Sequence, residues 1–391
     1  MNRNFFPLIF TLLTFPILSE TVTDRLSIVT DFKVRPSFYA TESPFLVDRN
    51  ALVYLGKTMN SDIVGIHLYE IKSKKKIFLT PPIREYFTKH SELLVPGALN
   101  FKDEPLSVYI SDLLFLDRTT GKAGFHIEHS HFKLSEKKYF FAVWDINSNE
   151  IEFVKEIYTR NASNENSYSI AGNIGFDPHE EAGYFSYGID ANMKEKGVDD
   201  VNIRIFRYKN GSLDELHSYF TKWFPYNSIF HFEKGKILIQ SYSEIHESPK
   251  PEGRIFDIKS SQFVQVSIPV VSYGAVFSKD GEKIYLTSAQ TGEIQVLDAN
   301  TGKILKKGKL GTHGHTMGFW KESELLWVRN SGIHIYDPVT LKQKKVIPTS
   351  KFFKGHVNVS GSFVIPYDSL LVHNGFEGPD GAAGMLFLSP D

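Results

Sequence analysis

The sequence contains no cysteine among its 391 residues. Disulfides, thiolate zinc sites, Fe–S clusters, a cysteine nucleophile and a lipid-anchoring cysteine are therefore all excluded. The chain also lacks an excess of either charge, because 44 Lys and Arg residues stand against 45 Asp and Glu residues. A typical nucleic-acid-binding domain carries a basic excess, so we expect no nucleic-acid partner.

Long hydrophobic runs are missing after residue 19. The one such run, Phe5 to Leu18, follows Arg3 and precedes the small residue Ser19. A basic start, a short apolar stretch and a small residue predict a signal peptide over residues 1–19. The run is shorter than the roughly 20 residues of a membrane span, so an uncleaved anchor is the less favoured alternative. We expect export to the periplasm, the outer surface or the extracellular space, with no membrane span after cleavage.

Aromatic residues are abundant, with 32 Phe and 18 Tyr, and this favours strands. The clearest unit starts at Gly274 and contains four short apolar runs, which are separated by turns that end at Gly281, Gly292 and Gly302. Glycine supplies the positive φ that tight hairpin turns require. Four antiparallel strands in about 40 residues is the size of one propeller blade.

The unit recurs along the chain. Gly274 and Gly314 are 40 residues apart, and Gly314 and Gly355 are 41 apart. The segment that begins at Gly97 and Ala98 resembles the Gly274 segment almost position by position. This regularity predicts a repeat architecture.

A second pattern supports the repeat. An apolar run ends in an acidic residue, and Ser or Thr follows three positions later; the acidic residues are Glu70, Asp117, Asp145, Asp257, Asp298 and Asp337. Such side chains accept hydrogen bonds from the backbone two or three residues on. We interpret these acids as turn residues and not as catalytic carboxylates.

The stretch from Val271 to Pro348 resembles the YVTN-type β-propeller repeat in its Phe277-Ser-Lys-Asp-Gly-Glu-Lys-Ile-Tyr and Val296-Leu-Asp-Ala-Asn-Thr-Gly-Lys segments. The resemblance implies a seven-bladed propeller of the kind found in surface-layer proteins, in periplasmic proteins and beside quinoprotein-like propellers. It implies no single activity. The chain departs from the pattern where Lys279 replaces proline and where Lys321-Glu-Ser-Glu replaces the turn of the next unit.

We therefore predict an all-β fold, a seven-bladed β-propeller of four-stranded antiparallel blades that forms a single domain over residues 20–391. The predicted blades span residues 36–82, 83–160, 161–221, 222–270, 271–310, 311–350 and 351–391. The last blade has room for three strands, so residues 24–31 are expected to supply its fourth and close the ring. Residues 83–160 could hold one blade with an insertion or two compressed blades, which leaves eight blades as the alternative.

Candidate site residues come from the innermost strands. The residues that follow the repeated glycine align at Ala98, Asn173, Ala275, His315 and His356. We expect the mouth of the channel to present Asn173, His315, His356 and the nearby His313. Imidazole is a common metal ligand, so His315 and His356 are the alternative metal pair, but a metal site needs three or four ligands and we predict no metal or cofactor.

Two further clusters are less specific. His126, His129 and His131 are close in sequence, but on a strand only His129 and His131 share a face, so a ready-made site is not expected there. Lysine runs follow the acidic turns, as in residues 303–309 and 342–345. Lysine on an edge strand blocks sheet-to-sheet pairing, and a basic rim for anionic polysaccharide, lipid headgroups or an acidic partner is the alternative.

These features predict an exported, monomeric binding or scaffolding module of the cell envelope or surface, which recognises a protein or glycan ligand at one mouth of the channel. G-x-x-x-x-G-K-[ST], H-E-x-x-H and G-x-S-x-G motifs are absent from the sequence, and we expect no enzymatic activity. The alternative is a propeller-type enzyme, a lactonase-like hydrolase or a quinoprotein-like oxidoreductase, with the channel histidines as base or metal ligands.

Overall fold

The computed structural model describes most of the chain. The described residues are 27–32, 45–48, 51–57, 64–70, 75–98, 107–117, 119–130, 136–160, 169–190, 201–222, 224–241, 252–268, 272–320, 323–329, 331–348, 357–365, 370–377 and 382–388. The predicted signal peptide lies outside them.

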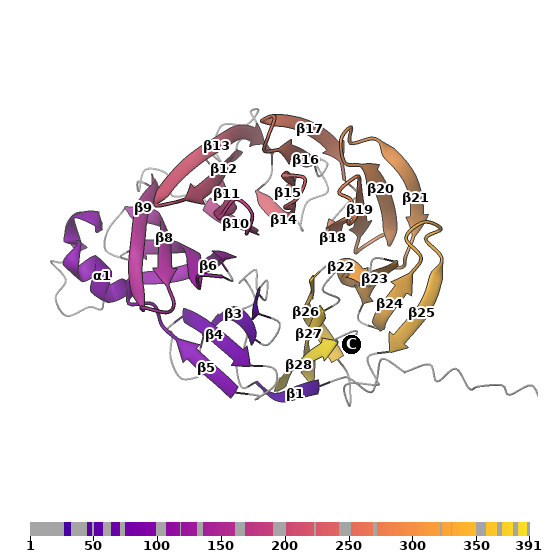
Figure 1. Ribbon diagram of the computed structural model, residues 1–391, viewed down its shortest axis with the longest axis horizontal. Coiled ribbons are helices and arrows are strands. Elements are labelled where there is room, and N and C mark those ends of the chain that lie inside the picture. The colour runs from indigo at the N-terminus through magenta and orange to yellow at the C-terminus, as the bar shows by residue number, and fades with distance from the viewer. Residues whose placement is uncertain are drawn as a thin grey trace, which may run out of the picture.

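The described strands form seven four-stranded antiparallel sheets, arranged as blades around a central axis (Figure 1). Blade 1 comprises β2 (Phe45–Asp48), β3 (Ala51–Lys57), β4 (Val64–Glu70) and β5 (Lys75–Leu79). Blade 2 comprises β6 (Val108–Leu116), β7 (Lys122–Ser130), β8 (Lys137–Asp145) and β9 (Glu150–Arg160). Blade 3 comprises β10 (Ser169–Asp177), β11 (Ala182–Asp190), β12 (Val201–Lys209) and β13 (Ser212–Thr221).

The second half of the chain continues the pattern. Blade 4 comprises β14 (Pro225–His231), β15 (Lys236–Ser241), β16 (Glu252–Asp257) and β17 (Gln262–Ser267). Blade 5 comprises β18 (Ser272–Phe277), β19 (Lys283–Ser288), β20 (Glu293–Asp298) and β21 (Ile304–Lys309). Blade 6 comprises β22 (Gly314–Trp320), β23 (Glu324–Arg329), β24 (Gly332–Tyr336) and β25 (Gln343–Pro348). In each blade the first strand is innermost, and the predicted all-β propeller is confirmed.

Blade 7 joins the two ends of the described chain. It comprises β26 (Val357–Ile365), β27 (Leu370–Glu377), β28 (Ala382–Leu388) and, as its outer strand, β1 (Ser27–Phe32). In the β1–β28 pairing Ser27 is opposite Phe387 and Ile28 is opposite Leu386. The predicted closure by an N-terminal strand is therefore confirmed.

The described strands of the long segment 83–160, β6 to β9, form a single four-stranded sheet with an insertion ahead of it. The insertion holds helix α1 (Ile83–Lys89) and the short 3-10 helix η2 (Ser91–Leu93). Phe87 of α1 is fully buried, and its ring centroid lies 5.0 Å from that of Phe140 in β8. This apolar contact holds the insertion against blade 2. No helix among the described residues is long and apolar enough to cross a bilayer.

The prediction that Gly97 and Ala98 open the first strand of blade 2 is wrong. Gly97 has a φ of 84°, and the Ala98 amide donates to the Val95 carbonyl at 3.0 Å, so these residues form a turn. The strand β6 begins ten residues later, at Val108. Gly97 is exposed, whereas Ala98 is 7% exposed and packs in the core of blade 2.

The repeated glycine has a steric reason in blade 6. A Cβ atom on Gly314 would lie 2.0 Å from the ring of the fully buried Trp327, and one on Gly274 would lie 2.7 Å from the same ring. The indole Nε1 donates to the Gly311 carbonyl at 3.0 Å. Glycine at both positions therefore makes room for the indole that packs between blades 5 and 6.

The connections divide the propeller into two faces. Because the strands are antiparallel, connections from first to second strand and from third to fourth strand emerge on one side, which we call the turn face. Connections from second to third strand, and from fourth strand to the next blade, emerge on the other side, which we call the loop face.

Candidate functional site

The acidic residues of the repeat lie on the turn face and cap its turns. Asp145, Asp257, Asp298 and Asp337 follow third strands, Asp117 follows a first strand, and each accepts hydrogen bonds from residues two or three positions on. In Asp298 the carboxylate accepts from the Thr301 amide at 2.8 Å and from its hydroxyl at 2.9 Å. Their interpretation as turn residues is confirmed; the side chain of Glu70 lies outside the described set.

A further turn acid escaped the sequence pattern. Asp177, at the end of β10, accepts from the amides of His179 and Glu180 at 2.8 and 3.3 Å. The residue three positions after Asp177 is Glu180 and not Ser or Thr, so the hydroxyl that identifies the other turns is missing. The available signal was an Asp at the end of one apolar run, followed by four turn residues and then by a second apolar run.

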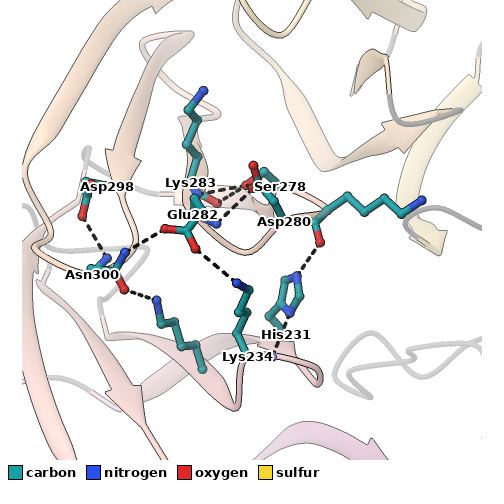
Figure 2. A network of polar contacts seen from close by, with 10 residues as sticks. His231, Lys234, Ser278, Asp280, Glu282, Lys283, Asp298 and Asn300 are labelled. Atoms are coloured by element: carbon teal, nitrogen blue, oxygen red, sulfur yellow. Dashed lines mark hydrogen bonds and ion pairs between the residues drawn. The ribbon is translucent and has the colours of Figure 1, made fainter.

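Polar side chains on the turn face also join neighbouring blades. Figure 2 shows this network at blades 4 and 5. The Glu282 carboxylate of blade 5 accepts from Asn300 Nδ2 of the same blade at 2.9 Å and from Lys234 Nζ of blade 4 at 3.3 Å. His231 Nε2 lies 2.9 Å from the Lys279 carbonyl, and Lys236 Nζ donates to Asn300 Oδ1. These contacts hold two sheets together at residues far apart in sequence.

Hydrogen bonds on this face hold carboxyl groups in their charged form. The pKa of Glu282 is lowered, first by the hydrogen bond from Asn300 and then by that from Lys234. The pKa of Asp280 is lowered, mainly by the Ser278 hydroxyl, which donates at 2.5 Å. The pKa of Asp298 is lowered by the amide and the hydroxyl of Thr301. These carboxylates already accept hydrogen bonds from other residues of the protein.

A hollow of about 450 Å³ opens on the turn face beside this network. Its lining comprises Glu233, Ser278, Lys279, Asp280, Lys283, Tyr285, Phe319 and Pro338. Two lysines and two carboxylates balance in charge there, and Asp280 is already bonded to Ser278. Two of its polar lining residues, Ser278 and Asp280, are therefore already used by the fold.

The loop face differs, because buried polar atoms without a hydrogen-bond partner among the described residues gather on its side. They belong to His126, Asn202, Arg204, Thr221, Ser228, Gln240, Glu252, Arg254 and Gln295, each in the middle or the loop-face half of its strand. Arg207 differs, because its buried Nε also has no partner among the described residues but lies in the turn-face half of its strand. Buried polar groups are nearly always hydrogen-bonded, so the partners of these atoms come from water, from a ligand or from residues outside the described ranges.

Gln240 is the most complete example. It lies in β15, the second strand of blade 4, and its side chain is fully buried. Neither Nε2 nor Oε1 has a hydrogen-bond partner in the described part of the chain. Its backbone neighbour on β16 is Gly253, which has no side chain to offer one. The carboxamide therefore presents one donor group and one acceptor group side by side.

A cationic group lies nearby on the same face. The guanidinium of Arg254 lies 4.2 Å from the centre of the Tyr219 ring, and its Nη2 donates to the Phe220 carbonyl at 3.2 Å. The Glu252 carboxylate oxygen Oε1 lies 3.8 Å from the same Nη2. Burial is the main cause that raises the pKa of the Tyr219 phenol, which therefore stays a hydrogen-bond donor. Phe220 is 55% exposed beside this group.

A third polar group lies at the innermost strand of blade 2. The register of β6 against β7 shifts between Ile110 and Asp112, which makes Ser111 the extra residue of a β-bulge. Ser111 Oγ lies 2.5 Å from His126 Nδ1, and Asp112 Oδ2 lies 3.6 Å from the same nitrogen. The imidazole is 3% exposed and stacks on Tyr139 at 5.7 Å between ring centroids.

The arrangement around His126 suits recognition better than nucleophilic catalysis. In a serine–histidine–aspartate relay the serine contacts one ring nitrogen and the carboxylate contacts the other. Here Ser111 and Asp112 both approach Nδ1, and Nε2 has no hydrogen-bond partner among the described residues. That nitrogen can donate or accept one hydrogen bond, depending on the tautomer.

The predicted site residues are placed only in part. Asn173 lies on β10, and its Nδ2 donates to the Leu113 carbonyl of β6 at 3.3 Å, so this amide links two innermost strands. His313 is exposed on the loop face, with a φ of 60°, and its amide donates to Ala289 at 2.7 Å. His315 lies on β22, but its side chain and all of His356 lie outside the described residues.

The histidine pair proposed for a metal therefore stays a prediction. Within the described residues, no three or more His, Asp or Glu side chains converge in a way that could hold a metal ion. His131 also lies outside the described set, while His126 and His129 of the same segment are both buried, with His129 Nδ1 3.0 Å from the Ser107 carbonyl. The sequence missed the Ser111–His126 contact because no sequence pattern marks a β-bulge.

Comparison with known proteins bears on the fold alone. No protein-family model matches the sequence, and no curated protein matches it. Among solved structures, the chain is similar to β-propellers. A chain of the mitotic checkpoint complex has a TM-score of 0.59 and 9% identity over 94% of this chain and 91% of that one. U3-55K has a TM-score of 0.55 and 9% identity over 93% and 98% of the two chains. The Dos1 propeller has a TM-score of 0.51 and 9% identity over 87% and 74%.

Proposed function

We propose that the protein is an exported, monomeric binding or scaffolding module of the cell envelope or surface, and that its loop face holds the ligand site. The observation that supports the proposal is the concentration, on this face, of buried polar atoms that have no hydrogen-bond partner among the described residues. The rigid blades keep those groups in place without a ligand, so little conformational entropy is lost when one binds.

The chemistry of the exposed and buried groups indicates the kind of ligand. Gln240 offers paired donor and acceptor groups, Arg254 offers a cation, and Phe220 offers an exposed ring. Peptides and glycans both carry dense donors and acceptors beside apolar faces, and either could satisfy these groups. A small apolar ligand would leave them unpaired, at a cost of about 1–3 kcal/mol for each group.

The proposed location rests on the sequence of the first nineteen residues. Their basic start, apolar run and small final residue support export, as the resemblance to the YVTN-type repeat does. The similar chain from the mitotic checkpoint complex belongs, by the name of that structure, to a multi-component assembly. A scaffolding role of that general kind is part of the proposal for this protein.

Screening the purified protein on peptide and glycan arrays tests the proposal. Binding to one class should be weakened at least tenfold by Arg254→Ala, because a charged hydrogen-bond donor contributes about 1.5–3 kcal/mol. The matched control is Lys234→Ala on the turn face, which should leave the affinity unchanged. Equal losses in both variants, or a ligand that is lost only with Lys234, would refute the loop face as the site. Light scattering of the purified protein measures its molar mass and so tests whether it is a monomer.

A further inference from the structure

The outer wall of blades 5 and 6 carries an unbalanced positive charge. Residues 303–309 and 338–345 include no Asp, Glu or Arg, and their cationic side chains are all exposed lysines. These are Lys303, Lys306, Lys307, Lys309, Lys342, Lys344 and Lys345, on β21, β25 and the turns that lead into them. We call this surface, with its apolar residues named below, the lysine patch.

The lysine patch is continuous across the two blades. Lys306 of β21 donates to the carbonyl of Val339 in the last turn of blade 6, at 2.6 Å. Two of the lysines have acidic partners, Lys307 with Glu293 at 3.5 Å and Lys344 with Asp337 at 3.7 Å. Both pairs are solvent-exposed, so solvent screens them and leaves much of the charge available. No ion pair holds Lys303, Lys309, Lys342 or Lys345 within the described residues.

Exposed aliphatic side chains are interspersed with these lysines. Ile304 is 42% exposed, Leu305 is 54% exposed and Val339 is 72% exposed. The register between β20 and β21 shifts between Val296 and Leu297, which makes Leu305 a bulged residue outside the regular ladder. The patch is therefore both cationic and apolar.

Edge protection does not account for this composition. The outer strand of blade 4, β17, has the sequence Gln-Phe-Val-Gln-Val-Ser and carries no charge at all. The outer strand of blade 3 carries Asp214 and Glu215. The outer strands of this propeller thus do not need seven lysines, and edge protection gives no reason to expose Leu305 and Val339.

We propose that the lysine patch docks on an anionic lipid bilayer. Clustered lysines are attracted to anionic headgroups, and aliphatic side chains beside them enter the boundary between headgroups and acyl chains. The absence of arginine favours a diffuse anionic surface over a pocket for one carboxylate or phosphate, because arginine provides the planar bidentate contact that such pockets use. Lysine is also depleted from the cores of protein–protein interfaces, which disfavours an acidic protein as the occupant. The inference does not rest on a ligand at the loop face.

Vesicle flotation of the full chain tests the inference. The probes are vesicles of phosphatidylcholine alone and vesicles with 30 mol% phosphatidylglycerol added, where about 30 mol% sets a surface charge that clustered lysines sense at low salt. The apolar segment Phe5–Leu18 can bind both kinds of vesicle, so the measured quantity is the ratio of the two partition coefficients. We expect a ratio above about two hundredfold at low salt, since each lysine near an anionic surface contributes about 1 kcal/mol, and the ratio should fall as salt is raised from about 50 to 300 mM.

Matched variants locate the effect. The triple variant Lys303→Gln, Lys309→Gln and Lys345→Gln should lower the ratio by about fivefold per lysine at low salt, and less where screening is stronger. The control triple variant Lys89→Gln, Lys222→Gln and Lys259→Gln removes the same charge from exposed sites on other parts of the chain and should leave the ratio nearly unchanged.

The variant Leu305→Ser separates a bilayer from a soluble polyanion. It replaces a side chain that is 54% exposed, so it should not disturb folding, and it should weaken binding to anionic vesicles severalfold. Equal partition into both vesicle types, equal losses in the two triple variants, or unchanged binding of Leu305→Ser to anionic vesicles would each overturn the inference. Complete displacement from vesicles by polyglutamate at matched charge would show an acidic polypeptide to be the preferred partner and would overturn it as well.

Discussion

The two faces of the propeller treat their polar groups in opposite ways. On the turn face, Asp117, Asp177 and Asp298 each accept hydrogen bonds from the backbone, and Glu282, Asn300 and Lys234 join two blades. On the loop face, Gln240 and His126 are buried with polar atoms that lack a partner among the described residues.

The difference separates groups that stabilise the fold from groups that are available for binding. A satisfied carboxylate contributes to stability, whereas a buried amide without a partner costs free energy that folding must offset elsewhere. A face that keeps such groups is therefore a candidate for function, since stability alone would favour apolar side chains there. Substitutions on the two faces should consequently change stability in opposite directions.

Removing a turn carboxylate should have the largest effect. Asp117 is 7% exposed and accepts from the amides of Thr119 and Thr120 and from the Thr120 hydroxyl. Asp117→Ala leaves these donors unpaired and should lower the free energy of unfolding by about 2–3 kcal/mol. Urea denaturation measures the change. Asp117→Asn keeps an acceptor oxygen and should lose less than half as much; equal losses in both variants would contradict the hydrogen-bond account.

Removing a polar side chain from the loop face should, in contrast, stabilise the fold. Gln240→Leu replaces a buried amide that has no hydrogen-bond partner among the described residues by an apolar side chain of similar size, and it should raise the free energy of unfolding by about 1–2 kcal/mol. The matched turn-face change, Asn300→Leu, removes the amide that binds Glu282 and Lys236 and should destabilise. If Gln240→Leu destabilised by more than Asn300→Leu in the same denaturation experiment, the contrast between the faces would fail.

Acid should weaken the turn face first. The folded-state pKa values of Asp280 and Asp298 are lowered by hydrogen bonds, so their contribution to stability is full above the ordinary Asp pKa of about 4 and is lost as the pH falls through the lower folded values. The melting temperature of the Asp280→Asn, Asp298→Asn double variant should therefore fall less between pH 5 and pH 2 than that of the parent protein. Parallel melting curves across this range would show that other groups dominate.

A surface ion pair on the turn face should matter least. Lys234 and Glu282 are about half exposed and 3.3 Å apart, so solvent screens their attraction. Lys234→Gln should shift the melting temperature by less than about 1 °C. A shift of several degrees would mean that the network of Figure 2 acts as a unit and that the single contact understates it.

The sequence was sufficient wherever the signal is local. The 40-residue spacing of Gly274 and Gly314 predicted blades, the acid–hydroxyl pattern at Asp298 predicted capped turns, and the three-stranded last blade predicted that the N-terminal strand closes the ring. The first two depend on residues within one turn or one repeat, where backbone preferences decide the structure. The third followed from counting the strands of the last repeat, which left one place for a distant segment.

Contacts between residues far apart in sequence were decided only in the folded molecule. Lys236 and Asn300 are 64 positions apart, and no pattern in either segment predicts that they meet. The bulge at Ser111 turns that hydroxyl toward His126. Gly97 and Ala98, whose sequence predicted the start of a strand, form a turn instead, and Ala98 packs in the same apolar cluster as Phe87 of helix α1. Which polar groups are left without partners depends on how whole sheets pack, and neither composition nor periodicity contains that information.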